Sequence, residues 1–160
     1  MSTTKRVLVT GAAGVIGRAL RDELHQRYQL RLMYHRTVLP QQGRDEVIVA
    51  DITDLAQMEA ACEGMDAVVH LAADPNTGAP WSSILPKNIV GAYNIYEAAH
   101  RHGVDCVVFA STNHVMGMYE KDGVPQRPEL LPVRPDGYYG ASKAFGEALG
   151  RYYADAFGFA

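Results

Sequence analysis

The sequence predicts an α/β fold in which a doubly wound parallel sheet of five strands lies between two layers of helices. Short apolar runs alternate with longer amphipathic segments along the chain, and each run is continuously apolar instead of alternating with polar residues. Strands of that kind are buried on both faces, as in parallel sheets covered by helices. With 160 residues, 48% of them hydrophobic, the chain is expected to form one domain with its own core.

The expected strands and helices follow one another in a regular order. Strands are expected at residues 6–10, 30–34, 46–50, 67–71 and 106–110. Helices are expected from residue 14 to about 27, directly after an N-cap at Asp54, from about 87 to 102, and from 139 to about 157. A loop rich in glycine and proline is expected to join the fifth strand to the last helix, over residues 113–137.

A glycine-rich turn joins the first strand to the first helix. The run Gly11-Ala12-Ala13-Gly14-Val15-Ile16-Gly17 directly follows residues 6–10, and the pattern after it places Val15, Ala19 and Leu24 on one side of a helix. In this context the glycines let the backbone approach a pyrophosphate, and free N–H groups at the helix N-terminus favour its charge. We therefore predict a dinucleotide-binding, Rossmann-type domain; a glycine turn without a ligand is the alternative.

The last predicted helix begins with a tyrosine and a lysine four residues apart. Tyr139 and Lys143 should lie on one helix face. A neighbouring ammonium favours the phenolate, and so lowers a tyrosine pKa from about 10 towards neutrality. About 0.2 such pairs are expected by chance in a chain of this kind. The pair therefore gains its weight from the nucleotide signature at the other end of the chain.

Composition and charge exclude several classes of protein. The net charge of −3 gives no reason to expect a nucleic-acid partner. The N-terminus runs into a strand without a signal-peptide core, and no apolar run reaches membrane-spanning length. Cys62 and Cys106 are isolated, and the histidines are scattered, so neither a disulfide nor a metal site is expected. We expect a cytoplasmic protein.

With these motifs in place, the sequence resembles the extended short-chain dehydrogenase/reductases of the NAD-dependent epimerase/dehydratase family. Residues 10–17 match the TGxxGxxG turn of that family, and Thr112, Tyr139 and Lys143 fall on its catalytic hydroxyl, tyrosine and lysine. The resemblance implies an NAD(P)-binding Rossmann domain over residues 1–160. It also implies a set of cofactor-binding residues, namely Gly11, Ala13, Gly14, Val15, Ile16, Gly17, His35, Arg36, Asp51, Ile52, Leu71, Ala72, Ala73, Asn88 and Ala110, together with Tyr139 and Lys143.

Two segments, residues 109–114 and 134–140, resemble uronate dehydrogenases. Residues 79–81 and 150–153 resemble the related short-chain type of glucose-6-phosphate dehydrogenase. These resemblances imply oxidation of C1 of a hexose or hexuronic acid to a lactone, with Asn113 and His114 at sugar hydroxyls. A histidine satisfied by the backbone is the alternative for His114. Two other functions stay open: a nucleotide-sugar epimerase or dehydratase, and a nucleotide-binding fragment without catalytic activity.

The sequence departs from the family in two places. The second strand ends in Met33-Tyr34-His35-Arg36, without the carboxylate that NAD-preferring members place there. Arg36 is expected to meet a 2′-phosphate, so NADP should bind at least as well as NAD.

The chain ends where the family begins a sixth strand, so we expect the C-terminal substrate region to be absent. The resemblance also implies a homodimer formed by the two long helices, with tyrosines at 93, 96, 152 and 153 in the core or at the dimer surface.

Overall fold

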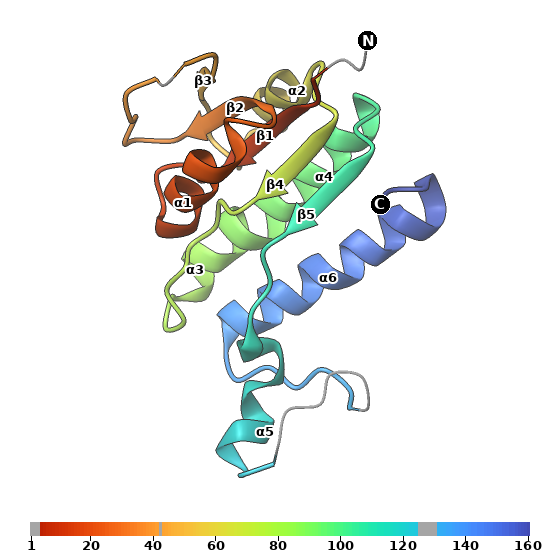
Figure 1. Ribbon diagram of the computed structural model, residues 1–160. Helices are drawn as coiled ribbons and strands as arrows, with labels where there is room; N and C mark the ends of the chain where they lie inside the picture. Colours follow the sequence, from red (N-terminus) through yellow and green to blue (C-terminus); the bar gives the residue numbers. More distant parts are fainter. Residues whose placement is uncertain (1–3, 42, 125–130) are drawn as a thin grey trace.

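The computed structural model describes residues 4–41, 43–124 and 131–160 and contains a parallel sheet of five strands (Figure 1). The strands are β1 (Arg6–Thr10), β2 (Gln29–Tyr34), β3 (Glu46–Val49), β4 (Ala67–His70) and β5 (Cys106–Phe109). They lie in the order β3-β2-β1-β4-β5, and every neighbouring pair is parallel. The predicted fold class is confirmed, and each predicted strand lies within one residue of its observed bounds.

The central strand β1 sits where the chain changes direction. After β3 the chain crosses to the other side of β1 and continues with β4 and β5. Thr10, the last residue of β1, pairs with Met33 on one side and with His70 on the other. In open α/β sheets, ligands bind in the crevice outside the carboxyl ends of the strands at such a reversal. The topology therefore indicates that a ligand would bind at the ends of β1 and β4.

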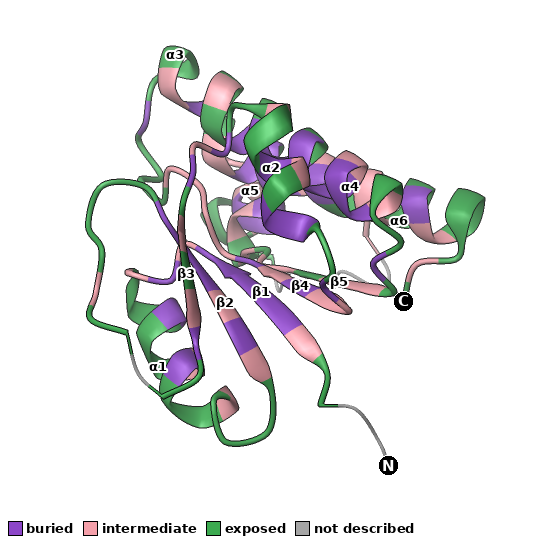
Figure 2. Cartoon of the chain, turned by 90° about the horizontal axis from the view of Figure 1, so that it is seen from above, coloured by how far each residue is buried: buried purple, intermediate pink, exposed green. Residues whose placement is uncertain are grey.

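Helices cover both faces of the sheet, which gives three layers (Figure 2). Helix α1 (Val15–Leu24) lies on one face; α2 (Leu55–Cys62), α4 (Gly91–Arg101) and α6 (Tyr138–Phe157) lie on the other. The predicted N-cap of α2 is confirmed, because the Asp54 carboxylate accepts a hydrogen bond from the backbone N–H of Gln57. None of the described helices is long and apolar enough to span a bilayer.

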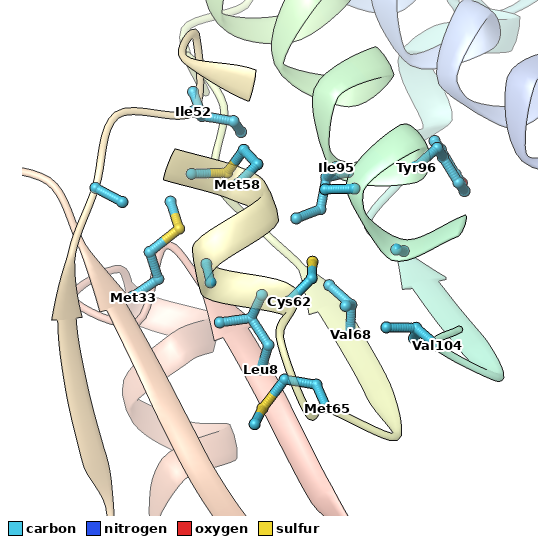
Figure 3. Packing of buried hydrophobic residues seen from close by; sticks show 14 of the residues in the cluster. Leu8, Met33, Ile52, Met58, Cys62, Met65, Val68, Ile95, Tyr96 and Val104 are labelled. Atoms are coloured by element: carbon cyan, nitrogen blue, oxygen red, sulfur yellow. The ribbon is translucent and has the colours of Figure 1, made fainter. Parts of the chain in front are cut away.

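The larger hydrophobic core lies between the sheet and α2 and α4 (Figure 3). Leu8 and Val68 point from the sheet towards Met58 and Cys62 of α2 and Ile95 of α4, all five without exposed surface. Burying an aliphatic side chain of this size stabilises the fold by about 1.5–3 kcal/mol. Burial also raises the pKa of the Cys62 thiol to about 12, so this cysteine is an apolar core residue.

Helix α1 faces the sheet with a side that the pattern did not predict. Val15 is 89% exposed, whereas Gly17 and Arg21 are buried. The Arg21 guanidinium donates to the Pro40 carbonyl and lies 3.5 Å from the equally buried Asp45 carboxylate. Of the three residues that the pattern places on one side, Val15 and Ala19 are exposed and only Leu24 packs on the core. The buried face of this helix is instead formed by Gly17 and by Arg21, which pairs with Asp45.

The helix expected from residue 87 begins earlier. It starts at α3 (Trp81–Ile84), passes through a π-helical turn, η1 (Leu85–Val90), and continues as α4. Pro80 precedes its first residue, where the absence of an N–H is harmless, and Pro86 lies at the start of the π turn. A proline inside a helix removes one backbone hydrogen bond, and a wider turn is one way to continue past it.

The predicted loop over residues 113–137 contains two short helices. They are the 3₁₀ helix η2 (Asn113–Met116) and α5 (Gly117–Lys121). The Thr112 hydroxyl accepts a hydrogen bond from the backbone N–H of His114 and so caps η2. Expecting a loop throughout was therefore wrong for residues 113–121; residues 125–130 lie outside the described part of the chain.

Candidate active site

The residues predicted to bind a cofactor gather at the carboxyl edge of the sheet, because every strand is parallel and ends there. They follow β1 (Gly11, Ala13, Gly14, Val15, Ile16, Gly17), β2 (His35, Arg36), β3 (Asp51, Ile52), β4 (Leu71, Ala72, Ala73) and β5 (Ala110). Residues spread over a hundred positions of sequence thus line one edge.

The glycine turn after β1 lies tightly against β4. Gly11 has φ +67°, and a Cβ atom there would lie 2.9 Å from the backbone nitrogen of Ala72. A Cβ atom at Gly17 would lie 2.6 Å from the Gly11 carbonyl oxygen. Among the described residues no side chain caps α1, and its first residues Val15 and Ile16 are exposed. The open N–H groups of this helix start fit an anionic phosphate.

A buried hydroxyl joins the ends of β1 and β4. Thr10 Oγ1 accepts hydrogen bonds of 3.1 Å from the backbone N–H groups of Leu71 and Ala72. Its own proton is therefore directed to Nδ1 of His70, 2.9 Å away. Burial, with a smaller contribution from the Lys143 charge, lowers the pKa of His70 to about 3. His70 is thus a neutral structural residue.

The ends of β2 and β3 carry opposite charges towards solvent. His35 and Arg36 are exposed, and Nε2 of His35 lies 3.6 Å from an Asp51 carboxylate oxygen. Hydrogen bonds from the backbone N–H and hydroxyl of Thr53, at 2.9 and 2.8 Å, lower the pKa of Asp51, and the charges of His35 and Arg36 lower it further. Asp51 therefore stays ionised beside two basic side chains.

Asn88 connects the loop after β4 to α6. Its buried amide accepts from the backbone N–H of Asp74 at 2.8 Å, donates to the Asp74 carbonyl at 3.2 Å, and donates to the Ser142 hydroxyl at 3.2 Å. Asn88 was predicted to bind the cofactor. Its contacts place it between the loop after β4 and α6, the helix that carries Tyr139.

The predicted Tyr139–Lys143 pair lies on one face of α6, where the helix passes the end of β5. Lys143 is only 5% exposed, and its ammonium donates a 2.7 Å hydrogen bond to the Ala110 carbonyl. The same nitrogen lies 4.8 Å from the centre of the Phe109 ring and 5.8 Å from that of Tyr139. Burial lowers the pKa of Lys143 to about 8, which leaves an ammonium that loses its proton readily.

Thr112, Asn113 and His114 lie at the same end of the sheet. Thr112 follows β5, and its hydroxyl donates to the Asn113 side-chain oxygen at 3.4 Å. The His114 ring lies edge-on to Tyr139, with 5.9 Å between ring centres. Its Nδ1 contacts both carboxylate oxygens of Asp136, at 2.9 and 3.1 Å. His114 is therefore satisfied by a side chain, and not by the backbone.

Two residues of this site were missed from the sequence. Thr10 was noted only as part of the glycine motif, and its hydrogen bonds to β4 become visible only once the strands pair. Asp136 belongs to the run 134–140 that resembled uronate dehydrogenases, which is the one sequence signal that pointed to it. Nothing in that run reveals that its carboxylate meets a histidine 22 positions earlier.

Comparison with known proteins agrees with this geometry. The sequence matches the NAD dependent epimerase/dehydratase family over residues 7–160. It is 47% identical to the L-arabinose 1-dehydrogenase (NAD(P)(+)) of Haloferax volcanii, over 96% of this chain and 63% of that protein. It is 42% identical to an NAD-dependent glucose-6-phosphate dehydrogenase of the same organism, over 93% and 63% of the two chains.

A solved structure is similar as well. A mutant uronate dehydrogenase from Agrobacterium tumefaciens, complexed with NAD, superposes with a TM-score of 0.85 at 39% identity, over 98% of this chain and 58% of that one. The chain therefore belongs to the NAD dependent epimerase/dehydratase family. It spans about three fifths of the length of these relatives.

The burial of Lys143 predicts a pH dependence of stability. The lysine pKa is about 8 in the folded chain and 10.5 in its ordinary state. Between these values the unfolded chain binds more protons than the folded one, so the free energy of unfolding should rise with pH over this window. Lys143→Met should remove that rise. The increase in its free energy of unfolding relative to the parent should be largest below pH 8. Urea denaturation at pH 7 and pH 10 measures this; equal pH dependence of both proteins would contradict the prediction.

Proposed function

We propose that this protein is an NAD(P)-dependent dehydrogenase that oxidises C1 of a hexose or hexuronic acid to a lactone. The observation that carries the proposal is the buried Lys143 beside Tyr139, at the same sheet edge as the glycine turn. The names of the relatives support a sugar or sugar-acid substrate.

The residues at the edge fit a nicotinamide dinucleotide. The open start of α1 suits the pyrophosphate, and the tight packing of Gly11 against β4 leaves the backbone accessible to it. The loop 71–73 lies at the end of β4, next to the topological reversal, and Lys143 lies at the end of the neighbouring strand β5. When bound, the nicotinamide supplies the hydride acceptor for the chemistry at C1.

Each catalytic side chain then has one task. Tyr139, as phenolate, takes the proton of the C1 hydroxyl, and the ammonium of Lys143 stabilises the phenolate charge. The Thr112 hydroxyl binds the same substrate oxygen and fixes its direction. Asn113 and His114 lie beside them and contact other hydroxyl groups of the sugar. The Lys143 contact with the Ala110 carbonyl holds the ammonium in place during the proton transfer.

Formation of reduced nicotinamide tests the proposal. Purified protein should reduce NADP or NAD in the presence of a hexose, its 6-phosphate or a hexuronic acid, measured by absorbance of the reduced cofactor. An epimerase or dehydratase would convert a nucleotide sugar without net reduction of free cofactor. Cofactor binding without turnover on any sugar would instead support the third function, a nucleotide-binding fragment.

Tyr139→Phe should reduce turnover by about 10²- to 10⁴-fold, because general acid–base groups typically supply a factor of that size. Cofactor affinity should stay nearly the same, since only the hydroxyl that moves the proton is lost. Steady-state kinetics and isothermal titration measure the two quantities. Activity within twofold of the parent would exclude Tyr139 as the catalytic base.

The exposed Arg36 predicts the cofactor preference. NADP should bind at least as tightly as NAD, and Arg36→Ala should weaken NADP selectively by about ten- to a hundredfold, the worth of one charge-assisted hydrogen bond. Isothermal titration with both cofactors measures this.

Gly14→Val is the control: a Cβ atom there would lie 3.3 Å from the Gly11 oxygen, so the fold should persist while both cofactors lose affinity. Much tighter binding of NAD by the parent would refute the preference.

We further propose a cytoplasmic homodimer. The cytoplasmic location is supported by the free thiols of Cys62 and Cys106, neither of which forms a disulfide. The dimer is supported by aromatic side chains on the outer surface of α4 and α6: Tyr93 is 41% and Tyr152 56% exposed. Their neighbours Tyr96 and Tyr153 are buried and stack between the two helices, with ring centres 5.5 Å apart.

Light scattering should therefore show a dimer at tens of micromolar, and Tyr152→Glu should shift it to monomer because a charge would enter an apolar interface. Tyr28→Glu is the control, because Tyr28 is exposed next to α1, away from these helices. A monomeric parent would argue against the interface, as would a dimer that survives Tyr152→Glu.

A further inference from the structure

The contact between His114 and Asp136 fixes where the histidine carries its proton. Nδ1 of His114 lies 2.9 and 3.1 Å from the two carboxylate oxygens of Asp136. An ionised carboxylate only accepts hydrogen bonds, so Nδ1 must be the donor. In a neutral imidazole the other nitrogen then has a free lone pair and accepts. The geometry therefore defines one tautomer, with the proton on Nδ1 and the lone pair on Nε2.

The Asp136 carboxylate is held where it is. Its side chain is 17% exposed and packs against Gly117, where any larger residue would collide with it. The backbone N–H of Asp136 donates to the His114 carbonyl at 3.4 Å, and its carbonyl accepts from the Lys121 ammonium at 3.5 Å. Asp136 and His114 are thus joined through both backbone and side chain.

The same unit includes the proposed catalytic tyrosine. The His114 ring lies edge-on to Tyr139 at an interplanar angle of 76°. Gly140 packs on the His114 carbonyl so closely that a side chain at 140 would not fit. The backbone N–H of His114 is bound to Thr112. With a third of its side chain exposed, His114 keeps its imidazole accessible beside Tyr139 and Thr112.

We propose that Asp136 is a positioning residue that holds His114 in the Nδ1–H tautomer, so that Nε2 accepts a hydrogen bond from a hydroxyl group of the sugar. The second half of this inference rests on the proposed dehydrogenase function; the first half does not. In the other tautomer the proton is on Nε2, which would then donate a hydrogen bond to the substrate. The site would in that case favour substrate groups that only accept hydrogen bonds. Asp136 thereby favours substrates with a hydrogen-bond donor at this position.

The tautomer can be read directly from nitrogen chemical shifts in a long-range proton–nitrogen NMR spectrum of histidine-labelled protein. The spectrum is recorded at about pH 9, well above the ordinary histidine pKa of about 6.5, and His114→Asn identifies the signals of interest. The parent should show His114 with a protonated Nδ1. Asp136→Asn should lose this preference, because an amide can donate to Nδ1 as well as accept from it.

Asp122→Asn is the matched control. Asp122 lies near the same loop, but its carboxylate pairs with Arg134 and not with His114, so the tautomer should stay as in the parent. Gly117→Ala provides a second variant, which keeps the charge of Asp136 and displaces its carboxylate; it should lose the preference too. A parent with the proton on Nε2, or a folded Asp136→Asn protein with the parent's tautomer, would overturn the positioning role.

The hydroxyl contact is tested by titrating the labelled parent with D-glucose and with D-glucuronate in the presence of NADPH, which cannot accept a hydride and so leaves the sugar unoxidised. The Nε2 signal of His114 should shift when one of these sugars binds. In kinetic assays Asp136→Asn should raise the KM of that sugar by about two- to tenfold, the effect of losing one neutral hydrogen bond. The KM of the cofactor should stay the same. Turnover without a shift at Nε2 would overturn the hydroxyl contact and leave the dehydrogenase in place. The Nδ1–H tautomer without turnover on any sugar would overturn the dehydrogenase and the contact, and leave the positioning role.

Discussion

The site depends on the close contact between the carboxyl ends of β1 and β4. Three groups meet there through one atom, because Thr10 Oγ1 binds two backbone N–H groups of the β4 loop and the ring of His70. The contact requires a neutral histidine, since a ring protonated on both nitrogens could not accept from the hydroxyl. Burial of His70 ensures that it is neutral at any ordinary pH. These hydrogen bonds of Thr10 hold the glycine turn after β1 beside the loop after β4.

At the end of β5, by contrast, a charged side chain is buried, and its burial costs free energy. Lys143 has little contact with water, yet its ammonium is bound to the Ala110 carbonyl and lies over two aromatic rings, which compensates part of the desolvation. Tyr139 stands in the first turn of α6, where the helix dipole favours negative charge. The end of β5 and the first turns of α6 together hold Tyr139 and Lys143 side by side.

The sequence was sufficient wherever a local rule decides the structure. Continuous apolar runs located the strands to within a residue, the glycine spacing located the turn, and Asp54 located the start of α2. It was insufficient where a distant residue decides. The buried face of α1 carries Arg21, whose partner Asp45 lies in the loop before β3.

The candidate site followed the same division. The Tyr139–Lys143 pair was visible because its spacing is that of one helix turn, and the parallel sheet brings the other predicted residues to one edge. The partner of His114 was not visible, because Asp136 reaches it only after the chain has formed η2 and α5 and returned. Pairing across such a distance leaves no periodicity in the sequence.

The π turn that precedes α4 has a consequence for how this chain tolerates insertions and deletions. A π turn holds one residue more than an α turn, and each residue advances the helix by about 100°. Asn88 lies inside this turn and points to Asp74 and Ser142, while Ile95 and Tyr96, further along, point into the core. Removing one residue from 85–90 would rotate one of these sets away from its partners. The extra residue is what allows a single continuous helix to serve both the site and the core.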